Sequence, residues 1–210
     1  MSKNIVFCGV GGQGTVLASK LVADAAMKEN RHVMTAETIG MAQRGGSVFS
    51  HMRIDAFGPH ADTGETSFPD VQDASVAAVS PLIARGSADL IIGFEPGETV
   101  RQLPYLKKDG FVVTSIRPVQ PVSAMIGLSA YDSDAMIDYL KTHVKHLIPV
   151  DADKALADIG NAKVLNMVLL GAAIRTGEVG VEPSDIVEAL HARLPEKLWE
   201  VNEKALSYIS

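Results

Sequence analysis

The chain has 210 residues, with 19 Lys and Arg against 25 Asp and Glu, a formal net charge of -6 and a hydrophobic fraction of 47%. That length fits one domain, which would bury roughly 70% of its unfolded surface, and abundant aliphatic residues exclude wholesale disorder. The acidic balance leaves no basic footprint for nucleic acid. A single Cys excludes a disulfide framework, an all-cysteine zinc site and an iron–sulfur cluster held by this chain alone.

Nothing in the sequence predicts secretion or insertion into a membrane. The first residues lead into a short β-like run and lack the long apolar core of a signal peptide. The most apolar later stretch, residues 164–174, is interrupted by Asn166 and is too short to cross a bilayer, so it predicts a buried helix. Together with the single Cys, these features predict a cytoplasmic protein.

Apolar runs and helical patterns alternate along the first two thirds of the chain. Residues 4–8 form a continuous apolar run that ends in a glycine cluster, which is typical of a central parallel strand. Further strands are predicted at 32–36, 89–93, 111–115 and 147–150, and helices at 16–27, 96–106 and 132–144. This alternation predicts an α/β fold with a doubly wound, mainly parallel, Rossmann-like sheet.

Two segments depart from the alternation. Residues 47–55 follow the second strand too closely for another crossover helix, which predicts an antiparallel strand at an edge of the sheet. Residues 56–73 are rich in Gly, Pro and acidic residues and contain no Lys or Arg, as in a surface loop or a segment that contacts a partner. From residue 151 the pattern is helical, so we expect residues 1–210 to form one domain whose part from 150 to 210 is helical. The predicted helices of that part are 153–159, 163–175, 183–193 and 196–208.

A glycine cluster lies between the first predicted strand and the first helix, as in the dinucleotide-binding fingerprint. It reads Gly9-Val10-Gly11-Gly12-Gln13-Gly14 and is followed by Thr15. Glycine lets the backbone turn tightly and approach a phosphate, and the free N–H groups of a helix start favour an anion. The same glycines would permit close packing of strand against helix, and the spacing alone favours neither interpretation. The acidic residue that the fingerprint expects about 20 residues further on would be Glu37.

A second cluster contains paired glycines next to a Gln-Arg pair, and it reads Gly40-Met41-Ala42-Gln43-Arg44-Gly45-Gly46-Ser47. Arg44 supplies a planar fork of donors suited to carboxylate or phosphate, although periodicity alone favours an ordinary bend with a surface charge. In the strand that follows, His51 and Arg53 share one face. There they would either bind an anion or form the solvated side of an edge strand.

A third candidate is the turn Glu95-Pro96-Gly97-Glu98, at the end of the predicted strand 89–93. Ligands gather at the carboxyl ends of strands in open α/β sheets. The structural alternative is a helix start with Pro at its first position and Glu98 favoured by the helix dipole. The six His show no metal-ligand spacing and Cys8 reads as a small core residue, so we predict no metal site.

Taken together, these motifs resemble a known family: the gamma-type domain of the 2-oxoacid:ferredoxin oxidoreductases, and in particular the small beta subunit of the indolepyruvate type. The resemblance covers nearly the whole chain, and Met41 to Ser47 is its most specific part. Residues 56–73 depart from the family pattern in being longer and more acidic. The residues that carry the resemblance are Gly11-Gly12-Gln13-Gly14, residues 37–47, Ser50-His51-Met52-Arg53, residues 88–96 and Gly160-Asn161.

The resemblance implies an enzyme complex that decarboxylates a 2-oxoacid on thiamine diphosphate, passes electrons through iron–sulfur clusters to ferredoxin and transfers the acyl group to coenzyme A. In the indolepyruvate type, thiamine diphosphate and the clusters belong to a larger alpha subunit. This chain, inactive alone, would complete the active site from one side and help to bind coenzyme A. No catalytic residue is assigned. The residues expected to line the site are Gly11, Gly12, Gln13, Gly14, Thr15, Gln43, Arg44, Gly45, Gly46, Ser47, His51, Arg53 and Glu95.

Two other functions stay open at this point. One is a stand-alone NAD(P)-binding Rossmann dehydrogenase that uses the glycine cluster, although no set of residues supplies an acid or base for hydride transfer. The other is a purely structural subunit. The sequence does not define the preferred oxoacid or the stoichiometry of a complex.

Overall fold

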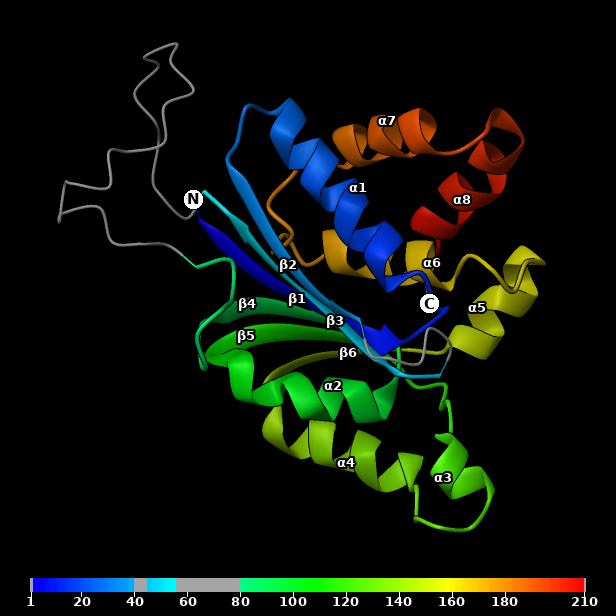
Figure 1. The fold of residues 1–210 in the computed structure, drawn as a ribbon. Helices are drawn as coiled ribbons and strands as arrows, with labels where there is room; N and C mark the ends of the chain where they lie inside the picture. The colour runs from blue at the N-terminus through cyan, green and yellow to red at the C-terminus, as the bar shows by residue number, and fades with distance from the viewer. Residues whose placement is uncertain (1, 40–44, 56–79, 210) are drawn as a thin grey trace, which may run out of the picture.

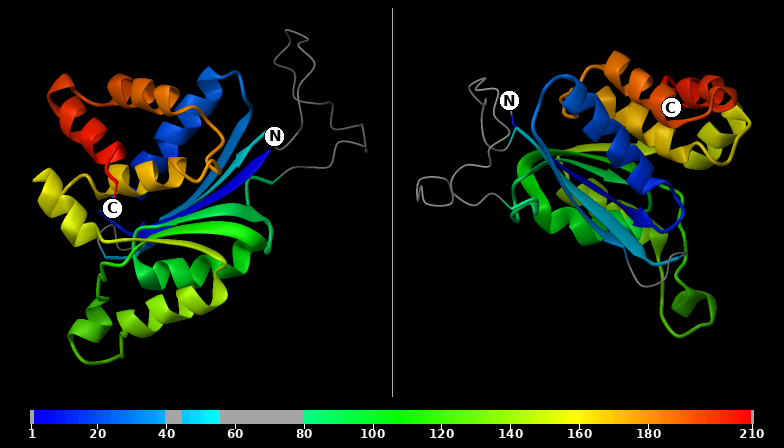
Figure 2. Two further views of the ribbon diagram at one scale, coloured as in Figure 1. Left: turned by 180° about the vertical axis from the view of Figure 1, so that it is seen from behind. Right: turned by 45° about the horizontal axis from the view of Figure 1, so that its top comes forward.

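The computed structural model describes residues 2–39, 45–55 and 80–209 (Figure 1). In this part of the chain, one six-stranded sheet carries helices on both faces (Figure 2). The strands are β1 (Lys3–Val10), β2 (Val33–Ile39), β3 (Ser47–Ile54), β4 (Ala88–Gly93), β5 (Leu106–Ser115) and β6 (His146–Val150). The helices are α1 (Thr15–Lys28), α2 (Pro96–Gln102), α3 (Val122–Met125), α4 (Ser133–His143), α5 (Ala152–Ile159), α6 (Leu165–Ile174), α7 (Pro183–Arg193) and α8 (Trp199–Leu206), with 3-10 turns η1 (Leu103–Tyr105) and η2 (Glu196–Leu198).

The strands lie in the order β2-β3-β1-β4-β5-β6. Strands β1, β4, β5 and β6 pair in parallel, whereas β3 is antiparallel to both of its neighbours, β1 and β2. The prediction of a doubly wound, mainly parallel α/β sheet is confirmed. The antiparallel direction of β3 is also confirmed, but its predicted place at the edge is wrong: β3 lies between β1 and β2 and pairs with both, so β2 is the edge strand.

Alternate residues of β1 face two different helical layers. Ile5 and Phe7 are fully buried in the core beneath α1, α5 and α6, and Val6 and Cys8 are fully buried on the α2 and α4 side. The helices α7 and α8 form a further layer outside α1 and α6 (Figure 2). As predicted from its apolar sequence, α6 is buried almost throughout.

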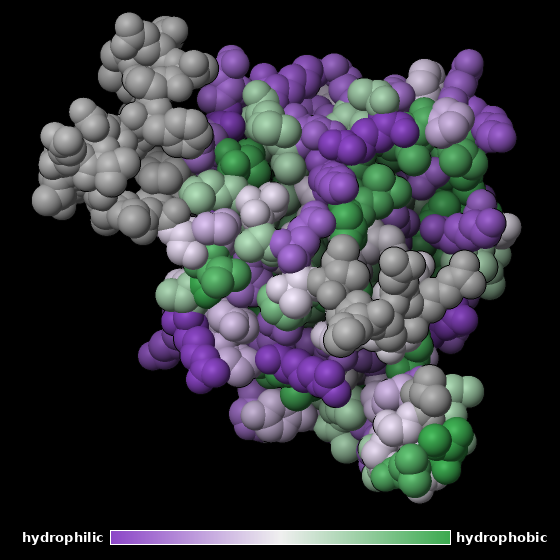
Figure 3. Space-filling model, viewed as in Figure 1, coloured by the Kyte–Doolittle hydropathy of each residue, from purple (hydrophilic) through white to green (hydrophobic). Residues whose placement is uncertain are grey.

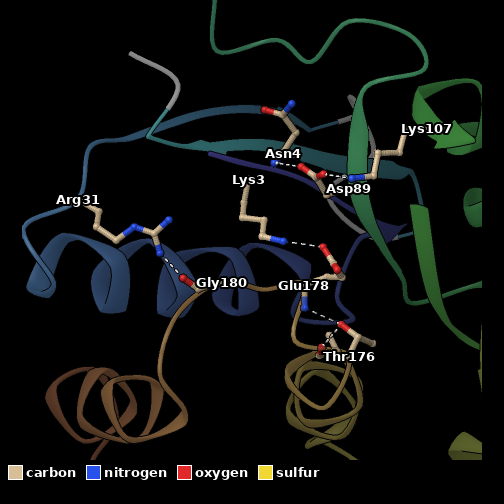
Figure 4. Close-up of polar contacts among 9 residues, drawn as sticks. Lys3, Asn4, Arg31, Asp89, Lys107, Thr176, Glu178 and Gly180 are labelled. Carbon is tan, nitrogen blue, oxygen red and sulfur yellow. Dashed lines mark hydrogen bonds and ion pairs between the residues drawn. The ribbon is translucent and has the colours of Figure 1, made fainter. Parts of the chain in front are cut away.

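A polar network joins the amino ends of the parallel strands to the segment after α6 (Figure 4). Lys3 forms an ion pair with Glu178 at 2.6 Å, and the N–H of Asn4 donates to Asp89 at 2.8 Å. Further contacts are Lys107 with Asp89, Arg31 with the Gly180 carbonyl, and the Glu178 N–H with the Thr176 hydroxyl. Charged side chains therefore join the strands to one another and to the segment after α6 at this end of the sheet. The opposite end carries the glycine cluster.

Candidate functional site

The carboxyl ends of β1 and β4 meet where the chain turns to opposite faces of the sheet. Helix α1 follows β1 onto one face and α2 follows β4 onto the other (Figure 1). Cys8 pairs with Gly93, and the N–H of Phe94 donates to the carbonyl of Cys8 at 2.7 Å. In open α/β sheets such a switch point is where ligands bind.

The side chain of Gln13 spans this switch point. Its Oε1 accepts a hydrogen bond from the Val10 N–H at 2.7 Å, and its Nε2 donates to the Phe94 carbonyl at 2.9 Å. The amide group thus joins the ends of β1 and β4. Gln13 shapes the turn, a role that its place in the motif did not reveal.

The glycines of the cluster are needed for different physical reasons. A Cβ on Gly9 would lie 2.7 Å from the Cβ of Phe94, and one on Gly14 would lie 2.7 Å from Nδ2 of Asn166, so packing requires glycine at both positions. Gly12 has a φ of +103° and would meet nothing within 4 Å. Close packing therefore explains Gly9 and Gly14, whereas Gly12 leaves open space in which a ligand can approach the backbone.

The glycine cluster and the Gly45-Gly46 bend are hydrogen-bonded to each other. The Gly11 N–H donates to the Gly46 carbonyl at 2.8 Å, and the Gly45 N–H donates to the Gly11 carbonyl at 3.5 Å. Two motifs far apart in the sequence thus form one surface at the carboxyl end of the sheet. Gln43 and Arg44 lie outside the described residues.

The start of α1 is open to an anion. Gly14 is the N-cap residue and brings no side-chain cap, and the first turn holds no acidic residue. The first N–H groups of a helix carry the positive end of its dipole and need acceptors from outside the helix. A cavity of about 350 Å³ lies against this turn. Its lining residues are Val10, Gly11, Gly12, Gly14, Thr15, Val16 and Val48.

Glu95 is a buried carboxylate with two specific partners. It is 2% exposed and caps α2, since its Oε2 accepts from the Glu98 N–H at 2.9 Å. Its Oε1 accepts from the hydroxyl of Tyr131. Burial and this bond to the carboxylate raise the pKa of Tyr131 above its ordinary value. The alternative interpretation of the 95–98 turn as a helix start is confirmed, and Tyr131 ties the loop before α4 to that turn.

Glu98 is a second buried carboxylate at the same end of the sheet. Its Oε2 accepts from the Ser47 hydroxyl at 2.5 Å, and its other oxygen lies 3.1 Å from the exposed guanidinium of Arg101. Both carboxylates border a cavity of about 550 Å³. Two acidic groups therefore line this cavity, next to the surface that the glycine motifs form.

His51 and Arg53 do not join that surface. Because β3 is antiparallel, it leads away from the carboxyl ends after Ser47, and Arg53 pairs with Asn4 at the opposite end. Arg53 donates to the Asn4 side chain at 3.2 Å and to the Ser80 carbonyl at 2.8 Å. His51 is 1% exposed, so of its two predicted alternatives the solvated strand face is wrong.

No sequence pattern predicted the contribution of Tyr131, and for Glu98 the pattern predicted only a role at the helix dipole. Tyr131 lies in a loop, where neither periodicity nor a motif marks it. The contact of Glu98 with Ser47 depends on the strand order, which places β3 and β4 on either side of β1. Neither contact has a local signal in the sequence.

Within residues 2–39, 45–55 and 80–209, no three His, Cys, Asp or Glu side chains gather closely enough to hold a metal ion. Across the described ranges, every helix is too short or too polar to cross a membrane.

Known proteins are similar to this chain in sequence and in fold. The family model described as pyruvate ferredoxin/flavodoxin oxidoreductase matches residues 4–209. Indolepyruvate oxidoreductase subunit IorB of Pyrococcus horikoshii is 35% identical over 207 residues, covering 96% of this chain and 91% of that protein. The IorB subunit of Archaeoglobus fulgidus is 34% identical over 207 residues, covering 98% and 92%. The gamma subunit of a keto/oxoacid ferredoxin oxidoreductase from Geobacter sulfurreducens has the same fold, with a TM-score of 0.62 at 21% identity over 97% of this chain and 94% of that one.

The fold and the paired glycine motifs thus define a Rossmann-like α/β protein with an open site at the carboxyl end of its sheet. The chain belongs to the pyruvate ferredoxin/flavodoxin oxidoreductase family. The family resemblance seen in the sequence motifs is confirmed.

Proposed function

We propose that this chain is the small, cluster-free subunit of a 2-oxoacid:ferredoxin oxidoreductase, with residues 1–210 acting as one gamma-type domain. It works with a larger alpha subunit that carries thiamine diphosphate and iron–sulfur clusters and that passes electrons to ferredoxin. The proposed substrate is indolepyruvate or another arylpyruvate, because relatives at 34–35% identity are indolepyruvate oxidoreductase subunits. The proposed location is the cytoplasm, in keeping with a single buried, unpaired Cys.

The hydrogen bond from Gly11 to Gly46 is the observation that carries this proposal. It joins the glycine cluster to the glycine pair of the most specific family motif, and the two form one surface at the open end of the sheet. Gly12 and the uncapped start of α1 border that surface and suit an anionic group. We assign them to the phosphate groups of coenzyme A, the co-substrate of this reaction class.

The donors of this chain do not fit the cofactors of the reaction. An iron–sulfur cluster needs several thiolates, and Cys8 is fully buried, with a pKa that burial raises above its ordinary value. Thiamine diphosphate is held through a divalent metal, and among the described residues no three His, Cys, Asp or Glu side chains gather to bind one. Both groups are therefore assigned to the alpha subunit.

This chain acts by positioning. The backbone N–H groups around Gly12 orient an anion, while Gln13 holds the turn against β4. Glu95, through Tyr131, holds the loop before α4 against the neighbouring cavity. No residue of this chain is given a covalent or acid–base step.

The alternative of a stand-alone NAD(P) dehydrogenase loses support from the order of the strands. Glu37, the residue that would bind the ribose hydroxyls, lies on β2, and β3 separates β2 from β1. Neighbouring strands are roughly 4.8 Å apart, so Glu37 stands one strand further from the glycine cluster than the fingerprint requires. Gln13 also bridges the crevice in which a dinucleotide would lie.

Co-expression with the alpha subunit from the same genome tests the proposal. The complex would be purified anaerobically through a tag on this chain and assayed for viologen reduction with indolepyruvate, phenylpyruvate, pyruvate and 2-oxoisovalerate in the presence of coenzyme A. We expect an iron- and thiamine-containing complex that is active on the aryl substrates and inactive without either subunit. A lone, colourless protein that binds NAD(P) tightly would contradict the proposal. Arg44→Ala tests whether the second motif is purely structural. If it is, turnover by the assembled complex should be unchanged in this variant.

A further inference from the structure

A lobe at the carboxyl end of the sheet, residues 118–131, exposes a cluster of apolar side chains. Met125 is 70% exposed, Ile126 63% and Leu128 77%. Figure 3 shows hydrophobic side chains gathered on this lobe, which carries α3 and projects from the rest of the molecule. The other exposed large apolar residues of the described chain are scattered singly: Met27, Leu82, Tyr139 and Ile209.

The lobe is also free of charge. Residues 118–131 contain no Asp, Glu, Lys, Arg or His, in a chain of which 21% is charged. Solvent-facing loops are normally polar, and single exposed apolar residues need no explanation. Exposed Met and aliphatic side chains together with depletion of charge are typical of the centre of a protein–protein interface.

Internal hydrogen bonds fix the shape of the lobe. The N–H groups of Ala124 and Met125 donate to the Pro121 carbonyl at 2.9 and 3.1 Å, and the Leu128 N–H donates to the Ser123 carbonyl at 2.8 Å. The hydroxyls of Ser123 and Ser129 lie 2.9 Å apart. A preformed surface loses little conformational entropy when a partner binds it.

The lobe is continuous with the candidate site. Tyr131 at its end is bonded to Glu95, and Val119, Ser129 and Tyr131 line the 550 Å³ cavity that Glu95 and Ser47 also line. A partner seated on the lobe would therefore cover the mouth of this cavity, beside the surface of the two glycine motifs.

We propose that the lobe is the surface on which the thiamine-diphosphate-bearing alpha subunit docks, with Met125, Ile126 and Leu128 entering an uncharged, apolar recess of that subunit. This inference rests on the proposed function. The absence of charge on the lobe favours an uncharged partner surface. A charged surface would lose its hydration against the lobe without gaining a counter-charge. A second copy of the chain is disfavoured as the occupant, since each copy carries a net charge of -6.

A double substitution tests the docking surface. Met125→Asp with Leu128→Asp places two charges on the lobe and leaves the fold intact, because both side chains are mostly exposed. The affinity of the purified alpha subunit for this chain, measured by calorimetry, should fall at least about 100-fold. Met27→Asp is the matched control: Met27 is 53% exposed near the end of α1, away from the lobe, and its affinity should stay within about twofold. Met125→Leu, which keeps the apolar contact, should also bind normally.

The outcomes separate the two proposals. If the wild-type chain binds the alpha subunit and the double variant binds equally well, the docking surface is wrong and the proposed function stands. If the wild-type chain does not bind the alpha subunit at all, the proposed function fails, and the docking inference fails with it. If the wild-type chain alone is a dimer that the double variant converts to a monomer, the occupant is a second copy and the inference is overturned.

Discussion

The Nδ1 atom of His51 accepts a hydrogen bond from the N–H of Ile83 at 3.0 Å. An accepting Nδ1 carries no proton, and burial lowers the pKa of His51 below its ordinary value. The proton therefore sits on Nε2, which has no hydrogen-bond partner among the described residues. The imidazole lies against Tyr105 with ring centroids 4.8 Å apart. His51 is thus a neutral core residue that fastens Ile83 to β3.

Acidification should destabilise the protein through His51. Because its pKa is lowered in the folded state, the unfolded chain takes up the proton first as the pH falls. The stabilisation is complete above the ordinary pKa of about 6.5 and is lost below it, by up to about 1.4 kcal/mol per pH unit. Urea unfolding between about pH 5 and about pH 8 measures this. His51→Asn keeps an acceptor for the Ile83 N–H but does not titrate, so its stability should depend less on pH. An equal dependence in both proteins would contradict a neutral His51.

Replacing Gln13 should disturb the turn at the switch point. Gln13→Glu keeps the acceptor for the Val10 N–H but turns the donor toward the Phe94 carbonyl into a carboxylate oxygen. The lost bond and the new repulsion should lower the free energy of unfolding by about 2–3 kcal/mol. Chemical denaturation checks this against Gln120→Glu, an exposed position that should change stability by less than about 0.5 kcal/mol. A Gln13→Glu protein as stable as the control would show that the amide does not hold the turn.

Removing the hydroxyl of Tyr131 should weaken the attachment of the lobe. Tyr131→Phe deletes a hydrogen bond to a buried carboxylate, which is worth about 1.5–3 kcal/mol. Alkaline titration of tyrosinate absorbance gives a second measurement. Among the four Tyr, Tyr131 has a raised pKa, so the variant should lose the step at highest pH. Tyr139→Phe, at a half-exposed position, should leave that step in place. If Tyr131→Phe also leaves it in place, the bond to Glu95 is not formed.

Gly171 should tolerate no side chain. A Cβ there would lie 1.9 Å from the backbone carbonyl oxygen of Leu206, so Gly171→Ala must push α8 away from α6. Overpacking against backbone should lower stability by about 3 kcal/mol. Gly86→Ala is the control, because Gly86 meets nothing within 4 Å and only its φ of +72° opposes a side chain, for about 1 kcal/mol. Thermal unfolding compares the two. Equal losses of stability in the two variants would mean that α8 can shift away from α6 at little cost.

Apolar runs predicted the fold because the central strands are covered on both faces. The continuous apolar run of β1, with its glycine turn, and the apolar length of α6 predicted these elements correctly. Both elements are largely buried in the structure. The first half of β5 gave no such signal, since Lys107 and Lys108 interrupt it and only the second half is mostly buried. The predicted helix 96–106 extends to the first residue of β5, whereas α2 ends at Gln102, before a 3-10 turn.

The candidate site was predictable where backbone geometry requires glycine. Gly12 and Gly45 both have positive φ, and their motifs are visible in the sequence. The hydrogen bond that joins the motifs, and the contacts of Ser47 with Glu98 and Tyr131 with Glu95, depend on the strand order. His51 and Arg53 share a motif with the site residues, but the direction of β3 carries them away from it.

The reversed direction of β3 has a consequence for how this family can vary. The chain passes the glycine surface at Ser47 and then runs to the opposite end of the sheet. There the Asp55 N–H donates to the His32 carbonyl at 2.8 Å, and Arg53 binds the Ser80 carbonyl. Both attachment points of residues 56–79 thus lie at the far end from the site. Substitutions around Asp55 and Ser80 can accumulate without altering the geometry around Gly12, so selection can act on the two ends of the sheet separately.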